Sequence, residues 1–134
     1  MYKNILVLLS LDHGIAERAI KAARNMKSDG GEITALHVYE PMHGSVGAYV
    51  SQEAVNEAIK GAEALLAERT KGMDDVKTLM LKGHIGRVIT DYATKNNIDC
   101  IVVGSHKPGM MDHFLGSTAS RIARYAPCSV HVLR

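Results

Sequence analysis

Continuous apolar runs alternate along this chain with segments whose apolar residues recur every three or four positions. Ile5–Leu9 is such a run, the pattern of a strand covered on both faces, and we therefore predict that it is central in a sheet. Ile33–Tyr39, Val76–Leu81, Ile98–Val103 and a last segment from Cys128 are predicted as four further strands.

Helical spacing of apolar residues separates these strands. It predicts four helices: Ile15–Met26, a long helix from Ser51 through Leu66, Ile85–Lys95, and one from about Ser117 to Tyr125. Asp12 is expected to cap the first helix, Asp29-Gly30-Gly31 to stop it, and Pro41–Tyr49 to form a glycine-containing loop. The regular alternation predicts a single α/β domain with a mainly parallel sheet and right-handed crossovers.

Composition narrows the possible partners. The 134 residues fit one domain, and with one Phe and no Trp the core must consist of aliphatic residues and Met. Sixteen Lys and Arg against fourteen Asp and Glu give a net charge of +2 without any charged block, so neither nucleic acid nor membrane is expected as a partner. Apolar runs are too short for a bilayer, which needs about 20 residues. Two distant cysteines and no recognisable secretion signal predict a cytoplasmic protein.

Small and polar residues follow the predicted strands. Ser10–Asp12, Val38–Glu40 and Gly104–Lys107 come after the first, second and fourth strands, and in parallel sheets ligands bind at these carboxyl ends. Gly116-Ser117-Thr118 opens the last helix. Glycine after a buried strand, followed by hydroxyl residues at a helix start, is typical of a site where backbone amides face an anion.

Several catalytic motifs are absent. Gly104 and Gly109 have the spacing of a phosphate loop, but Met110 and Met111 replace its Lys and hydroxyl residue, and no GxGxxG follows the first strand. A small-molecule hydrolase acting through Ser10 lacks a GxSxG elbow. Seven scattered histidines show no metal-ligand spacing, and His37 is expected to be packed or bonded to backbone. We therefore predict no catalytic residue.

The combined pattern resembles the universal stress protein family over essentially the whole chain. The resemblance is carried by KNILVLL, TALHVYE, GHIGRVITDYATKNNIDCIVVGSH and LGSTASRIARYAPCSVHVLR. It implies that residues 1–134 form one Rossmann-like domain, with a five-stranded parallel sheet of order 3-2-1-4-5 and helices on both faces.

The resemblance also implies an ATP site, with or without Mg2+. Adenosine would lie near the first two strands, with the backbone of Val38 at the adenine, and the phosphates on the glycine loop and last helix. Ser10 stands where the family often has Asp. Lys107 replaces the second loop glycine and is separated from Gly116 by eight residues, similar to a GSHRP form of the loop. The implied nucleotide-binding residues are Leu8, Ser10, Val38, Val103, Gly104, Ser105, His106, Lys107, Gly116, Ser117 and Thr118.

The function that follows is an ATP-binding stress-response or regulatory module with an unidentified client protein, for which slow ATP hydrolysis stays open. The family commonly dimerises through its last strand, and Ser129–Leu133 would leave an unpaired sheet edge that a second copy could cover. The alternative is a dimeric interaction protein of the same fold that binds no nucleotide.

Overall fold

Five parallel strands form one sheet. The computed structural model of the chain describes residues 1–11, 14–42, 44–105 and 115–134. The strands are β1 (Tyr2–Leu8), β2 (Lys27–Tyr39), β3 (Val76–Lys82), β4 (Cys100–Gly104) and β5 (Ser129–Leu133). Their order is β3-β2-β1-β4-β5, with every neighbouring pair parallel. The predicted α/β class and sheet order are both confirmed.

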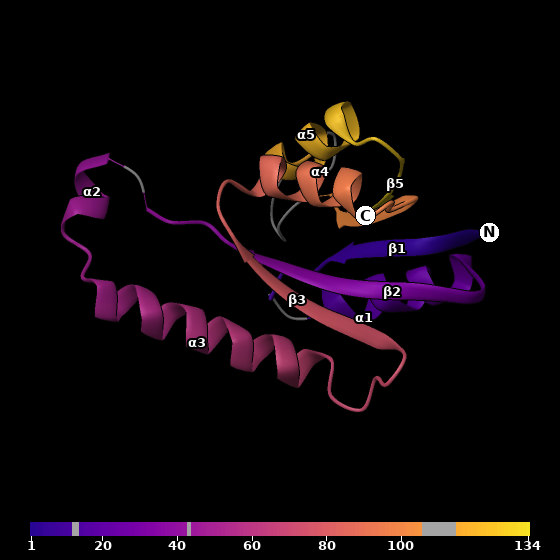
Figure 1. The fold of residues 1–134 in the computed structure, drawn as a ribbon, viewed down its shortest axis with the longest axis horizontal. Helices are drawn as coiled ribbons and strands as arrows, with labels where there is room; N and C mark the ends of the chain where they lie inside the picture. Colours follow the sequence, from indigo (N-terminus) through magenta and orange to yellow (C-terminus); the bar gives the residue numbers. More distant parts are fainter. Residues whose placement is uncertain (12–13, 43, 106–114) are drawn as a thin grey trace.

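Helices cover both faces of the sheet. They are α1 (Ile15–Met26), α2 (Gly44–Ala48), α3 (Gln52–Arg69), α4 (Ile85–Lys95) and α5 (Ser117–Tyr125). Figure 1 shows α1 on one side of the sheet, and α4 and α5 on the other. The four predicted helices are confirmed, and α2 is a short helix within the segment predicted as a loop. Asp12, the predicted cap of α1, lies outside the described residues; the residue at the N-cap is Gly14, in the left-handed region.

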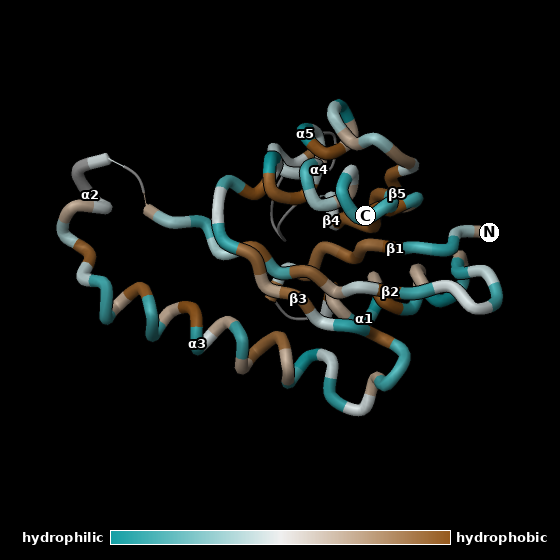
Figure 2. The backbone as a smooth tube through the Cα atoms, viewed as in Figure 1, coloured by the Kyte–Doolittle hydropathy of each residue, from teal (hydrophilic) through white to brown (hydrophobic). Residues whose placement is uncertain are grey.

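The sheet separates two apolar cores because side chains alternate between its faces. The first core joins Ile5 and Val7 of β1 to α1 and to Leu66 of α3. The second joins Leu6 of β1 to α4 and α5, including Ile89 and Ile122. Residues 5–7 have no exposed surface, which confirms the predicted central position of β1. Figure 2 shows the hydrophobic colour concentrated along this strand.

β2 begins earlier than predicted. The segment Asp29-Gly30-Gly31 does follow the end of α1, but it lies inside β2 rather than in a separate turn. The pairing of β1 with β2 is irregular between Tyr2 and Asn4, and Gly30 has a φ of 73°. Glycine adopts this backbone conformation without strain. The bulge lets the strand continue through a sequence that favours a turn.

The long helix α3 contributes less to the core than its apolar stripe predicts. Leu66 is its only buried residue among those described, and Leu65 is 39% exposed. Figure 1 shows α2 and the first half of α3 extending away from the sheet. No helix within the described residues is both long and apolar enough to cross a membrane.

Candidate functional site

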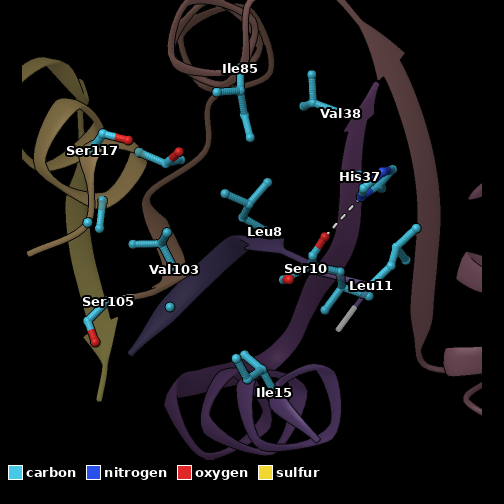
Figure 3. A pocket seen from close by; sticks show the side chains of 15 residues that line it. Leu8, Ser10, Leu11, Ile15, His37, Val38, Ile85, Val103, Ser105 and Ser117 are labelled. Atoms are coloured by element: carbon cyan, nitrogen blue, oxygen red, sulfur yellow. Dashed lines mark hydrogen bonds between the residues drawn. The ribbon is translucent and has the colours of Figure 1, made fainter. Parts of the chain in front are cut away.

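A pocket of about 520 Å³ opens at the carboxyl ends of β1, β2 and β4. The starts of α1, α4 and α5 form its remaining walls (Figure 3). Crossovers in a parallel α/β domain bring strand ends and helix starts to the same edge of the sheet. Segments from residues 8 to 119 therefore meet here, as the sequence pattern predicts.

Every described residue of the predicted site lines this pocket. These residues are Leu8, Ser10, Val38, Val103, Gly104, Ser105, Gly116, Ser117 and Thr118. His106 and Lys107, the other two predicted residues, lie outside the described part of the chain. The geometry thus brings together a set that comes from separate stretches of sequence.

One half of the pocket is apolar. Leu8, Val38 and Val103 come from three adjacent strands, and each is less than one tenth exposed. Ile85, the first residue of α4, faces the same space (Figure 3). Apolar walls with a few convergent polar groups are typical of small-molecule sites, whose volumes run from about 300 to 1,000 Å³. This half suits a flat, largely apolar ring.

The start of α5 supplies the polar half. The N–H of Gly116 donates to the Ser105 carbonyl at 2.5 Å, and the N–H of Ser105 donates to the Leu133 carbonyl at 2.8 Å. These bonds fix the helix start against β4 and β5. The N–H of Ser120 donates to the Gly116 carbonyl at 2.9 Å, the first bond of the helix. The amides of residues 117–119 therefore precede the helical ladder, where anions are favoured.

The fold does not require a glycine at position 104. A Cβ built on this residue would meet Ile15 Cγ2 at 3.7 Å, an ordinary van der Waals contact. Its φ lies outside the left-handed region that favours glycine. Packing and backbone conformation would therefore accept alanine. The absence of a side chain at Gly104 instead leaves room for a ligand beside the main chain.

The end of β2 presents backbone groups beyond the last residue of β1. The N–H of Leu9 donates to the Leu36 carbonyl at 2.9 Å. Backbone groups of successive strand residues point to alternate sides, so those of Val38 point to the same side as those of Leu36. At Val38, however, β1 has already ended at Leu8. The N–H donor and the carbonyl acceptor of Val38 thus lie side by side on the pocket wall.

His37 holds the turn that follows β1. Its Nδ1 lies 3.1 Å from the Leu9 carbonyl oxygen, and because a carbonyl only accepts, Nδ1 carries the proton. The predicted backbone bond of His37 is confirmed. The side chain also lines the pocket between Leu11 and Val38 (Figure 3), a position that the sequence pattern did not assign to it.

The start of α4 already faces a carboxylate. The N–H of Ile85 donates to Glu40 Oε1 at 3.4 Å, and His84 Nε2 lies 4.0 Å from the same oxygen. Among the described residues, the starts of three helices border the pocket, those of α1, α4 and α5, and the chain's own negative charge, Glu40, sits at the start of α4. A ligand's anionic group is favoured at the start of α5, where Ser117 and Thr118 add hydroxyls.

Five lining residues are not predicted by the sequence pattern, namely Leu9, Ile15, His37, Ile85 and Ala119, whereas Leu11 lies within the predicted strand end Ser10–Asp12. A signal was available for Ile85, because the carboxyl end of β3 shares its sheet edge with the other strands. Within the described residues, no group of three or more His, Cys, Asp or Glu side chains could hold a metal ion.

Comparisons with known proteins agree with this geometry. The model of the universal stress protein family matches residues 1–134. The universal stress protein in the QAH/OAS sulfhydrylase 3' region of Thermus aquaticus is 30% identical over 139 residues, which cover all of both chains. The solved structure of the hypothetical protein MJ0577 is similar with a TM-score of 0.81 and 25% identity, over 99% of this chain and 96% of that one.

A universal stress protein solved in complex with cAMP shares the fold. Its TM-score is 0.73 at 16% identity, over 99% of this chain and 97% of that one.

Proposed function

The chain belongs to the universal stress protein family, and we propose that it binds ATP and acts as a stress-response or regulatory module. The observation that carries this proposal is the division of the pocket into an apolar half and a helix start. An adenine nucleotide has the same division, with a flat base at one end and an anionic chain at the other. The solved relative that contains cAMP supports the choice of an adenine ligand.

The starts of α4 and α5 set the orientation of the nucleotide in this proposal. Adenine lies against Leu8 and Ile85, with its edge at the backbone of Val38. The phosphates lie at Ser117 and Thr118, whose amides and hydroxyls donate to anionic oxygens. The reverse orientation would place phosphate beside Glu40, where two negative charges repel.

The proposed role is binding rather than turnover. The described lining residues supply hydroxyls, backbone groups and the imidazole of His37, which lies at the adenine end beside Val38, and none of them is a carboxylate that could bind Mg2+. The residues thus fit Mg2+ only as an ion that arrives with the phosphates. In this proposal the nucleotide state of the pocket is what a client protein senses.

Calorimetry with ATP, ADP and adenosine tests the proposal directly. We expect ATP to bind more tightly than adenosine, because only ATP reaches the start of α5. The difference in affinity between ATP and adenosine should decrease as the salt concentration rises, because salt screens the charge of the phosphates. Adenine nucleotide released from the purified protein on denaturation would be a second sign. Failure of all three ligands to bind would favour the alternative, an interaction protein that uses no nucleotide.

We also propose a homodimer paired through β5, which occupies one edge of the sheet. The N–H of Ser105 donates to the Leu133 carbonyl, so Leu133 and His131 direct their backbone groups to β4. Those of Val132 point outward by alternation. An unpaired strand edge of this kind is a ready site for a second copy.

Replacing Val132 by proline is expected to convert this dimer to a folded monomer. Proline removes the outward N–H, and an edge strand tolerates it. Light scattering at micromolar concentration measures the state, and circular dichroism checks folding. His131→Pro is the control, because it breaks the bonds to β4 and should unfold the strand. A monomeric wild type, or a Val132→Pro variant that stays dimeric, would contradict pairing through β5.

The proposal places the protein in the cytoplasm. Cys100 and Cys128 are both free thiols, as expected in a reducing compartment. Burial in the sheet raises the pKa of Cys100 to about 11. This thiol therefore stays protonated at neutral pH, and it serves packing rather than redox chemistry.

A further inference from the structure

The side chain of Arg121 fills a space that Gly86 leaves open between α4 and α5. A Cβ built on Gly86 would collide with the Cγ, Cδ and Nε atoms of Arg121. Gly86 is a buried residue in the first turn of α4. Its lack of a side chain permits this close approach of α5.

The guanidinium group of Arg121 ends over an aromatic ring. Its Cζ lies 5.7 Å from the ring centroid of Tyr125, which is 59% exposed. Tyr125 is the last residue of α5 and lies one turn after Arg121. Helical side chains usually point toward the N-terminus of their helix, which brings the Tyr125 ring back toward Arg121. The contact gives the guanidinium group a partner that is not one of the pocket-lining residues.

Arg121 lies next to pocket-lining residues of both α4 and α5. It is three residues after Thr118 and so on the same face of α5. Its aliphatic stem lies against Gly86, the residue that follows Ile85 in α4. Thr118 and Ile85 both line the pocket. No Lys or Arg stands among the pocket-lining residues that the structure describes. The positive charge of Arg121 is thus one turn of helix away from a pocket half that favours anions.

We propose that Arg121 leaves Tyr125 and binds the distal phosphates when a nucleotide occupies the pocket. This inference rests on the proposed function, and it adds a residue that distinguishes polyphosphates from nucleosides. Because Gly86 has no side chain, the long side chain of Arg121 has room there to turn toward the start of α5. Guanidinium forms paired hydrogen bonds with phosphate oxygens, which adds geometry to charge.

Calorimetry on matched variants tests this role. Arg121→Met keeps the apolar stem at Gly86 and removes the charge, and we expect it to weaken ATP ~10-fold, as expected for hydrogen bonds to a charged group. Adenosine affinity should stay unchanged. Arg124→Met is the control, because it removes the same charge one turn further along α5 and should leave the ratio of ATP to adenosine affinity near that of wild type.

Tyr125→Leu provides an independent measurement. It releases Arg121 from the ring, so ATP should bind ~2- to 5-fold more tightly, the usual worth of an exposed cation–π contact. Equal ATP losses in Arg121→Met and Arg124→Met, or weaker ATP binding in Tyr125→Leu, would overturn the inference while leaving nucleotide binding intact. A wild type that binds neither ATP nor adenosine would overturn the proposed function as well.

Discussion

Replacing Gly116 by valine is expected to weaken ATP binding at least tenfold, or by about 1.4 kcal/mol. Gly116 lines the pocket immediately before α5. Its φ of −57° and ψ of 156° are open to any residue, and its N–H can still donate to Ser105. The fold should therefore survive, while two methyl groups occupy the space at the helix start.

Adenosine separates this effect from a general disturbance. Because the proposed adenosine contacts lie at Leu8 and Val38, Gly116→Val should reduce adenosine affinity less than ATP affinity. Gly61→Val is the matched control, because Gly61 is exposed on α3 and a Cβ added there would meet no atom within 4 Å. Calorimetry on the three proteins, each checked for folding, gives the comparison. Equal ATP affinities of wild type and Gly116→Val would falsify the phosphate position at α5.

Much of the fold could be predicted because local and tertiary signals agree. The apolar run at Ile5–Leu9 indicates a strand buried on both faces, and β1 lies between β2 and β4. The start of β2 could not be predicted in the same way. Gly30 and Gly31 favour a turn, and the β1–β2 pairs on either side of them, Tyr2 with Lys27 and Asn4 with Glu32, keep the strand in the sheet. Tertiary pairing overrides local preference there.

The candidate site was predictable where backbone chemistry is visible in the sequence. Gly104 and Gly116 indicate close approach to the main chain, and both line the pocket. His37 was missed because a strand residue carries no such signal, and Ile85 was missed although the carboxyl end of β3 shares its sheet edge with the other strands. Arg121 could not be found either, because its importance comes from the space that Gly86 leaves in another helix.

The second large effect concerns stability. Leu6→Ala is expected to lower the free energy of unfolding by about 3 kcal/mol, within the range for buried leucines. Leu6 has no exposed surface, and it packs in the core between the sheet and α4 and α5. Its neighbours on both adjacent strands are paired in register, at Thr34 and Ile101. The sheet therefore cannot easily close the cavity that alanine leaves.

Leu65→Ala makes the same chemical change at a side chain that is 39% exposed. It should cost less than about 1 kcal/mol, because little apolar surface returns to water. Thermal melts at one fixed protein concentration measure both variants, and Leu6→Ala should lower the melting temperature by roughly 10 °C. Equal losses would contradict the assignment of the core to the sheet faces rather than to α3. Since Leu6 lies outside the pocket lining, Leu6→Ala should also keep its ATP affinity wherever it remains folded, so that stability and binding respond to different residues of one strand.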